Sequence, residues 1–316
     1  VSNLEFIAPL MAKAPKFFNF FSTSHLAEIA ANKTIGMTYL PALSTPNLQK
    51  QLVEIGYQGE TLENLEAQQA SGQFSAENCQ TVLVVQDPFT TFYDAKVVAD
   101  FVAFIQKLGF KPVVLPYKPT GKAQHIKGFL SKFAKTAKNQ ADFLNRIAKL
   151  GLPMVAIDPA LTLLYRDEYR DILKAERGDF KVLLAHEWLI EQIKSGVLDN
   201  CKKAKETDRL PWHLFAHCTE TTELPTSSNE WQQIFAHFGE TLVSEKVGCC
   251  GMAGTFGHET AHVEMSKAIY QQSWQQKLKN APLERCLATG YSCRSQVKRM
   301  EHQQIKHPIQ ALLSII

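Results

Sequence analysis

Residues 81–115, TVLVVQDPFTTFYDAKVVADFVAFIQKLGFKPVVL, decide the fold class of this chain. The β-branched and apolar residues at 81–85 predict a buried strand. An amphipathic helix is expected at 93–108, because Val97, Phe101 and Phe104 recur at helical spacing on one face. Gly109 ends that helix, and residues 111–115 predict the next strand. A strand, a helix and a second strand in this order predict a parallel sheet covered on both faces.

The same alternation continues along the chain. The further elements expected are a helix at 126–150, a strand at 153–157, a polar connection at 201–210, a strand at 212–216 and a helix at 231–238 closed by Gly239. Before the first strand, residues 1–78 predict a helical arm, in which Thr61 can cap a helix running to Gln69. We therefore predict an α/β fold with two duplicated Rossmann-like parallel-sheet lobes preceded by a helical N-terminal arm.

Spacing supports the duplication. Residues expected at the ends of successive strands are 31 positions apart in both halves, and the next interval is 42 positions in one half and 43 in the other. The residues matched in this way are Asp87 with Cys218, Lys118 with Cys249, Pro119 with Cys250, and Leu161 with Cys293. The units expected are the arm at 1–78, a degenerate first repeat plus connection at 79–210, and a second repeat with a metal site at 211–316.

Composition limits the classes of function. With 316 residues, 45% of them hydrophobic, the chain can fill a core in each lobe without disulfides. The formal charge of +3 is small and the basic residues are dispersed, so nucleic acid is not the expected partner. No apolar run approaches the roughly 20 residues of a membrane helix, and no export signal is visible, which predicts a cytoplasmic protein. Because the first residue is Val, we expect a piece of a longer polypeptide.

Cysteines carry the strongest chemical signal. Five of the seven follow residue 217, a distribution that suits metal or redox work better than a secreted disulfide framework. Four of them, Cys218, Cys249, Cys250 and Cys293, are expected in loops at matched strand ends and form a soft set suited to iron–sulfur or zinc. Adjacent thiols converge on one metal only in a tight loop, which Gly251 permits, and we expect the N-terminus of the next helix to favour their negative charge.

The other three cysteines, Cys79, Cys201 and Cys286, are expected only to pack, as buried cysteines often do. Cys286 is the least secure of them, because a bend in its strand could bring it to the metal as a fifth sulfur.

Three further motifs are weaker. The glycines at 251–257 lack the opening of a dinucleotide fingerprint, and Gly121-Lys122 lacks the rest of a phosphate loop. His258-Glu-Thr-Ala-His262 has the spacing of a zinc-peptidase helix, but nearby thiols would compete for the metal.

The cysteine region resembles the CCG, or cysteine-rich, domain family of heterodisulfide reductases, glycolate oxidase iron–sulfur subunits and related FAD-linked oxidases. That family's full repeat has a lone Cys, then Cys-Cys-Gly, then Cys-x-x-Cys. The chain matches at Cys218, at 249–251 and at Cys293, and it departs at Gly290, where a Cys would fall. The stretch ATGYSCRSQ at 288–296 is most similar to the C-terminal region of a group of large bacterial D-2-hydroxyacid dehydrogenases. These are fused FAD-linked, iron–sulfur enzymes of the kind that oxidises 2-hydroxyglutarate.

The resemblance implies an iron–sulfur portion that relays electrons after a flavin oxidises a 2-hydroxy acid. It implies a cluster, 4Fe–4S in its ordinary form, on the four thiols, with His217, Gly251, His258 and Gly290 near it. FAD would bind in a portion that is absent from this sequence, so the partners are the FAD-binding and ferredoxin-like portions of the same parent protein. Because Gly290 leaves four thiols instead of five, a zinc site or an empty site stays open.

Two other classes of function also stay open. One is a zinc-stabilised interaction module, and the other is a thiol–disulfide enzyme with Cys249 or Cys250 as nucleophile. The catalytic residues, the substrate and the oligomeric state are not fixed by the sequence.

The first repeat is expected to bind no metal, because Asp87 and Asp158 offer only hard oxygens. Its strand ends would instead gather the basic side chains of Lys118, Lys122, His125 and Arg166 around an anionic group, unless these residues belong to solvated, vestigial loops.

Overall fold

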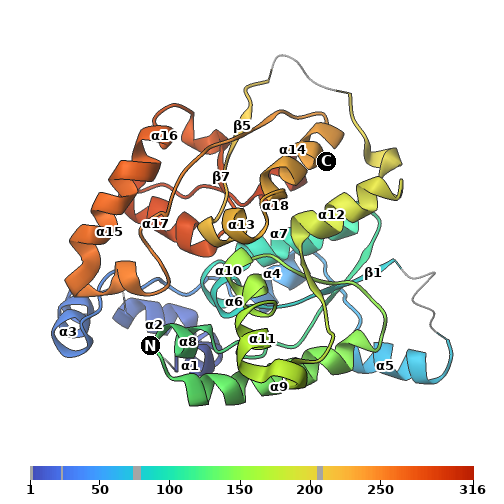
Figure 1. Ribbon diagram of the computed structural model, residues 1–316, viewed down its shortest axis with the longest axis horizontal. Coiled ribbons are helices and arrows are strands. Elements are labelled where there is room, and N and C mark those ends of the chain that lie inside the picture. The colour runs from blue at the N-terminus through green and yellow to red at the C-terminus, as the bar shows by residue number, and fades with distance from the viewer. Residues whose placement is uncertain (1–2, 23, 74–79, 205–208) are drawn as a thin grey trace.

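Two parallel β-sheets form the framework of the computed structural model, which describes residues 3–22, 24–73, 80–204 and 209–316 (Figure 1). The first sheet has the order β2-β1-β3-β4, with β2 at Lys111–Val114, β1 at Thr81–Val84, β3 at Met154–Ala156 and β4 at Val182–Leu184. The second has the order β6-β5-β7, with β6 at Leu242–Ser244, β5 at Trp212–Phe215 and β7 at Cys286–Ala288. Every pairing is parallel, as predicted.

The predicted strand–helix–strand unit is present, with β1 pairing β2 from Thr81 opposite Lys111 to Val84 opposite Val114. Its helix is two helices, α6 at Pro88–Tyr93 and α7 at Ala95–Lys107. The side chain of Asp87 caps α6 by accepting two backbone N–H bonds, and Pro at the first helical position is already in helical geometry. The amphipathic pattern predicted α7 because the apolar residues of that helix are the ones that become buried. The short helix α6 has no such pattern and is stabilised by its Asp87 cap instead.

The connection after the third strand holds more structure than predicted. It contains α10 at Pro159–Leu164, α11 at Glu168–Leu173, the fourth strand β4, and α12 at Ala185–Lys194. The strand β4 has three buried residues, which is too few to show a periodic pattern. The helix expected at 126–150 is α9 at Leu130–Ala148, and a short additional helix, α8 at Lys122–Ile126, precedes it.

A single apolar core joins the two sheets. Helix α12 packs on α14 (Ser227–His237), and the C-terminal helix α18 (Pro308–Ile315) packs on α7 of the first half. Buried side chains from both sheets, including Val84 and Leu214, belong to this one cluster. The outer face of each sheet has a cluster of its own, and the outer cluster of the second sheet contains Cys250, Cys286 and Cys293. The two sheets therefore fold around a common interior.

The N-terminal arm is helical, as predicted. Its helices are α1 at Leu4–Met11, α2 at Pro15–Ser22, α3 at His25–Ile35, α4 at Leu48–Glu54 and α5 at Leu62–Ala70. The Thr61 hydroxyl caps α5, as expected, by accepting from Asn64 N at 3.2 Å. Helices α4 and α5 pack on the first sheet through Leu52 and Leu65, so this half of the arm is part of the core. None of the helices in the described ranges is both long enough and apolar enough to cross a membrane.

Glu5 ties α1 to the first sheet. Its side chain is 1% exposed and accepts backbone N–H bonds from Thr120 at 2.5 Å, Gly121 at 2.9 Å and Ala123 at 3.1 Å. The Thr120 hydroxyl donates a fourth bond at 3.0 Å. Consecutive backbone N–H groups at the start of a helix form a concave site for an anion, and here the protein supplies that anion itself.

We predict that Glu5→Gln loosens the N-terminal arm. A neutral amide weakens the charged hydrogen bonds and directs an NH₂ group at backbone donors, which costs about 1–3 kcal/mol. Hydrogen exchange should become faster in 4–22 while the exchange of β1 and β3 stays unchanged. The control is Glu63→Gln, at an exposed position of α5. Equal exchange in the two variants would contradict this role for Glu5.

Candidate metal centre

Four cysteines meet at the carboxyl end of the second sheet. Cys218 is the first residue of α13 (Cys218–Glu223), which follows β5, and Cys293 is the third residue of α17 (Tyr291–Glu301), which follows β7. Cys249 and Cys250 lie in the loop after β6. Loops at the carboxyl ends of parallel strands converge, and this edge is where α/β sheets usually bind ligands.

The four thiols are linked by hydrogen bonds. Cys249 bonds with Cys218 and with Cys250, and Cys250 bonds in turn with Cys293. Bonds from Cys218 and Cys250 hold the pKa of the Cys249 thiol far below its usual value, while the bond with Cys249 raises that of Cys218. Cys250 and Cys293 are buried, whereas Cys218 and Cys249 are partly exposed. The arrangement gathers soft donors, and the bonds to Cys249 favour its thiolate form.

These thiols form a linked set and not a closed cage for a single ion. In the described portion of the chain, no group of three or more His, Cys, Asp or Glu side chains is placed around one point to hold such an ion. The donor chemistry nevertheless fits the cofactor that the sequence implied, because thiolates are the ligands of iron–sulfur clusters and also bind zinc. The residues that would hold such a group are Cys218, Cys249, Cys250 and Cys293.

The loop that carries the adjacent thiols is pinned on both sides. Gly251 has a φ of 86°, and a Cβ there would lie 2.3 Å from the Ser266 carbonyl oxygen, so only glycine fits. The Ser266 hydroxyl donates to the Gly251 carbonyl at 2.7 Å. On the other side, the carbonyl of Gly248 accepts from the Trp274 indole N–H at 3.0 Å, within the π-helical turn Gln271–Gln275. A π-helical turn often marks a functional site.

The helix expected to follow the adjacent thiols and their small residues is present, but its N-terminus does not adjoin the thiols. Two short 3₁₀ turns, Phe256–His258 and Thr260–His262, follow the loop, and α15 (Val263–Tyr270) begins only at Val263. The N-termini that lie at the thiols are those of α13 and α17, which carry Cys218 and Cys293 themselves. The electrostatic argument applies to these two helices instead, because the partial positive charge of a helix is confined to its first turn.

His217 occupies the place of the missing fifth thiol. A Cβ at Gly290 would lie 2.3 Å from Cδ2 of the His217 ring, so the ring and a side chain at 290 exclude each other. The Nδ1 of His217 accepts from Thr219 N at 3.2 Å. Burial lowers the pKa of His217, and the nearby negative groups include Asp158 and Cys249. Gly290 is therefore a steric partner of a neutral, buried histidine.

We predict that Gly290→Cys alone destabilises the fold by about 1–3 kcal/mol, because the added side chain overlaps the imidazole. Combining it with His217→Ala should cost less than the two single changes added together, since the alanine vacates the space. Denaturant unfolding of the four chains gives the coupling. Strict additivity would show that His217 and residue 290 do not compete.

The three remaining cysteines lie apart from the four. Cys286 is fully buried at the amino end of β7, with its thiol 3.5 Å from the Pro282 carbonyl oxygen, and burial raises its pKa to about 12. It precedes the strand end that leads to Cys293, which argues against a role as fifth sulfur. Cys201 packs partly buried at the edge of the shared core. Cys79 lies outside the described residues.

Two aspartates at the strand ends of the first sheet cap helices. Asp87 caps α6, and Asp158 caps α10 through bonds from Ala160 N and Leu161 N. The second carboxylate oxygen of Asp158 accepts from Tyr291 N at 2.7 Å, which joins this edge to the start of α17. Burial, followed by the charge of Asp158, raises the pKa of Asp87 to about 7.

The four basic residues expected around an anion each have another partner. Lys122 Nζ lies 2.6 Å from Glu168 Oε1, and His125 Nδ1 is 3.9 Å from the same oxygen. Arg166 donates to Glu187, and Lys118 lies over the Phe143 ring. The anion that this region does bind is the carboxylate of Glu5, through backbone N–H groups and the Thr120 hydroxyl. The basic side chains therefore do not gather around one ligand in this structure.

His258 faces the arm. Its Nδ1 lies 3.3 Å from the Thr38 carbonyl oxygen, while its own carbonyl accepts from Thr38 N at 2.8 Å. His262 stacks on Phe256 with ring centroids 4.3 Å apart. Because the two histidines lie on separate 3₁₀ turns, they do not form the face of a zinc-peptidase helix. Figure 1 shows α3 of the arm beside α15.

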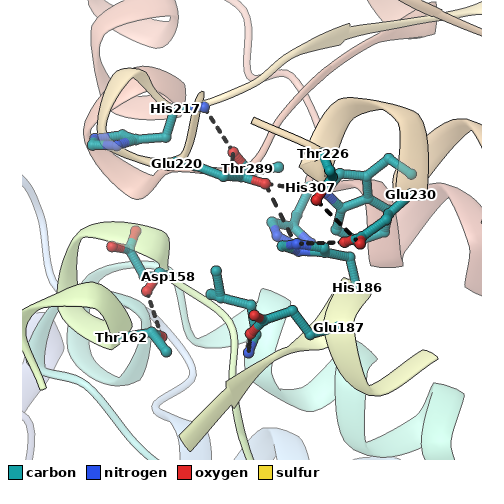
Figure 2. Close-up of polar contacts among 12 residues, drawn as sticks. Asp158, Thr162, His186, Glu187, His217, Glu220, Thr226, Glu230, Thr289 and His307 are labelled. Atoms are coloured by element: carbon teal, nitrogen blue, oxygen red, sulfur yellow. Dashed lines mark hydrogen bonds and ion pairs between the residues drawn. The ribbon is translucent and has the colours of Figure 1, made fainter. Parts of the chain in front are cut away.

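A buried polar network behind α13 was not anticipated. Glu220 is fully buried and accepts from the Thr289 hydroxyl, which in turn accepts from His217 N at 2.9 Å (Figure 2). Burial raises the pKa of Glu220 to about 7. Burial likewise lowers the pKa of His186 to about 4, so this ring is neutral at pH 7 beside Glu220 Oε1 at 3.8 Å and Glu230 Oε2 at 3.5 Å. The network fixes α13, and with it Cys218, against β7.

We predict that His186 makes the protein acid-sensitive. Its folded pKa lies below the unfolded value of 6.5, so its contribution is fully present above pH 6.5 and is lost as the pH falls towards 4. The loss between pH 7 and pH 5 should be about 2 kcal/mol. Urea unfolding of His186→Gln should show a smaller difference between these pH values, with His302→Asn, at an exposed site, as the control. An unchanged pH dependence in His186→Gln would exclude this residue as the cause.

Arg294 was the other missed residue. It is 2% exposed and forms an ion pair with Asp94 Oδ2 at 2.9 Å, while its NH1 donates to the carbonyls of Ala288 and Thr289. Only its position directly after Cys293 could have drawn attention to it.

Comparison with known proteins shows that the chain is similar to one portion of longer proteins. It is 57% identical to the D-2-hydroxyglutarate dehydrogenase of Haemophilus influenzae, 55% to that of Escherichia coli K12 and 38% to that of Pseudomonas putida. The alignments cover 99–100% of this chain but 30% of each relative. The chain is a homologue of one portion of these dehydrogenases. A subunit of the anaerobic glycerol-3-phosphate dehydrogenase of Escherichia coli K12 is 23% identical over 58% of the chain and 46% of its own length. No family model matches.

Proposed function

We propose that this chain is the iron–sulfur, electron-transfer portion of an FAD-linked oxidoreductase that oxidises a D-2-hydroxy acid such as 2-hydroxyglutarate. The observation that carries the proposal is the meeting of Cys218, Cys249, Cys250 and Cys293 at one sheet edge, linked thiol to thiol. The substrate class follows from the relatives, of which the chain covers 30%. FAD and a ferredoxin-like portion belong to the remaining length of the parent protein, and the chain corresponds to its C-terminal region.

The fold supports membership of the CCG family. The strand orders β2-β1-β3 and β6-β5-β7 match when β1 is paired with β5, as a duplicated unit requires. At the strand ends of the first repeat, the capping residue Asp87 is matched with Cys218, and the capping residue Asp158 is matched with Gly290, three positions before Cys293. In these terms residues 79–210 are the degenerate repeat plus connection, and 211–316 are the repeat with the metal site.

The chain's own residues define what the centre can do. A cluster bound here accepts and passes single electrons, which is the chemistry that iron–sulfur groups supply. Cys250 and Cys293 would hold its buried side, while Cys218 and Cys249 are partly exposed. His217 excludes a fifth thiol at 290, so the proposed centre is an ordinary four-iron cluster. None of the cysteines in the described part forms a disulfide, which suits the reducing cytoplasm.

We predict that the chain purified without oxygen contains about four iron and four sulfide per molecule. Cys218→Ala, Cys249→Ala, Cys250→Ala and Cys293→Ala should each deplete iron strongly, because each removes one ligand. Cys201→Ala and Cys286→Ser are the matched controls and should keep the iron. In the intact parent, Cys249→Ala should stop electron delivery to the acceptor while D-2-hydroxyglutarate still reduces the flavin.

Two outcomes would replace the proposal. Stoichiometric zinc in a colourless chain, with electron delivery surviving Cys249→Ala, would establish the zinc-stabilised module. Absence of both metals together with rapid alkylation of Cys249 would establish a thiol–disulfide function, which the low pKa and partial exposure of that thiol favour.

A further inference from the structure

Helices α1 and α2 present an apolar surface to the outside. We call it the aromatic face, and it consists of Phe6, Ile7, Leu10, Phe17, Phe20 and Phe21, which are between 48% and 75% exposed. On α1 its members stand at positions i, i+1 and i+4, and on α2 at i, i+3 and i+4, so each helix contributes one stripe. The three α2 rings touch one another, with centroids 4.9 Å and 5.3 Å apart. Clustered exposed apolar residues mark an interaction site more often than single ones do.

The outward orientation of α2 is fixed by polar contacts on its inner side. The Asn19 amide donates to the Leu43 carbonyl and accepts from Leu43 N, both at 2.8 Å. Phe18 packs partly buried against the small cluster around Leu43 and Phe92. None of the residues of α2 is fully buried. Its amphipathic pattern is thus reversed relative to that of a surface helix, with an amide anchored inside and phenylalanines outside.

We propose that the aromatic face is the surface on which the remaining portion of the parent polypeptide docks. The relatives are more than three times as long as this chain, so most of their length must pack somewhere. A covalently tethered partner has a high effective concentration at such a surface, which favours it over a second copy. Aromatic side chains are the residues enriched at the centres of interfaces, and Lys13 and Lys16 between the two stripes suit an acidic, polar rim on the partner.

The same arm also contacts the segment that follows the adjacent thiols. Thr260 N donates to the Gly36 carbonyl at 2.8 Å, and Met37 forms a β-bridge with Glu259, in the segment that follows the adjacent thiols. Glu5 holds α1 against the first sheet. A portion docked on α1 and α2 is therefore held by the segment that also supports the cysteine loop. The location of the surface does not depend on which metal occupies the centre, and only the naming of the partner rests on the proposed function.

Hydrogen exchange tests the surface without any substitution. The amides of 15–22 should exchange at least roughly tenfold more slowly in the intact parent than in the isolated 316-residue chain. Those of 48–54, in α4, should exchange alike in both. Equal rates for 15–22 in the two proteins would overturn the proposal, whatever the metal content.

A triple variant of the parent, Phe17→Ser/Phe20→Ser/Phe21→Ser, gives the second test. It should remove the protection of 15–22 and slow electron delivery from reduced flavin roughly tenfold, with iron content unchanged. The control is Val53→Ser/Val197→Ser, which alters two exposed apolar residues elsewhere. If the unsubstituted parent contains no iron but 15–22 are still protected in it, the proposed function fails and the docking surface stands.

Two other occupants of the aromatic face would also overturn the docking proposal. A mass that doubles with concentration for the isolated chain, and returns to that of the monomer in the triple variant, would assign the face to a second copy. Binding of the intact parent to phosphatidylglycerol vesicles, lost in the triple variant, would assign it to a membrane surface.

Discussion

The buried ion pair between Arg294 and Asp94 is the contact on which the arrangement of this protein depends. Both side chains are nearly inaccessible to water, and separating them would leave an unpaired charge in the interior, at a cost of about 3–5 kcal/mol. Arg294 follows Cys293 on α17, and Asp94 precedes α7 of the first sheet. The bond from Tyr291 N to Asp158 and the stacking of Phe89 on Tyr291 act at the same junction. Together these contacts set the helix that carries one thiol against the other half of the molecule.

The two halves use the same strand ends for different chemistry. In the first, the side chains of Asp87 and Asp158 cap helices by accepting backbone N–H bonds. The hydrogen-bonding needs of these carboxylates are therefore met within the protein. In the second, Cys218 stands at the place of Asp87, while Gly290 stands at the place of Asp158 and makes room for the ring of His217. Behind them, Glu220 and His186 have pKa values shifted by burial towards their neutral forms. Among the thiols, Cys249 is the one whose pKa is lowered by its neighbours, which favours its negatively charged form.

The arm links this centre to the outside. Its inner half belongs to the core through α4 and α5, and its outer half is held by the buried carboxylate of Glu5 and by the amide of Asn19. Between the two halves, Thr38 bonds to His258 in the segment that follows the cysteine loop. A single stretch of chain thus contacts the sheet, the cysteine loop and an exposed aromatic surface. The helical content was evident in the sequence, but this connection was not.

The sequence by itself determined the α/β class, most of the strands and the four thiols. These features are local or periodic: alternation of elements predicts parallel strands, and parallel strands bring their following loops to one edge. Only the tertiary structure decided that the two sheets share one core, that β4 extends the first sheet, and that no helix begins directly behind Cys250. It alone paired Glu5 with 120–123, Arg294 with Asp94 and His217 with Gly290. Those pairs join residues far apart in the chain. Their energies come from burial and from steric exclusion, and no local pattern of residues reveals either.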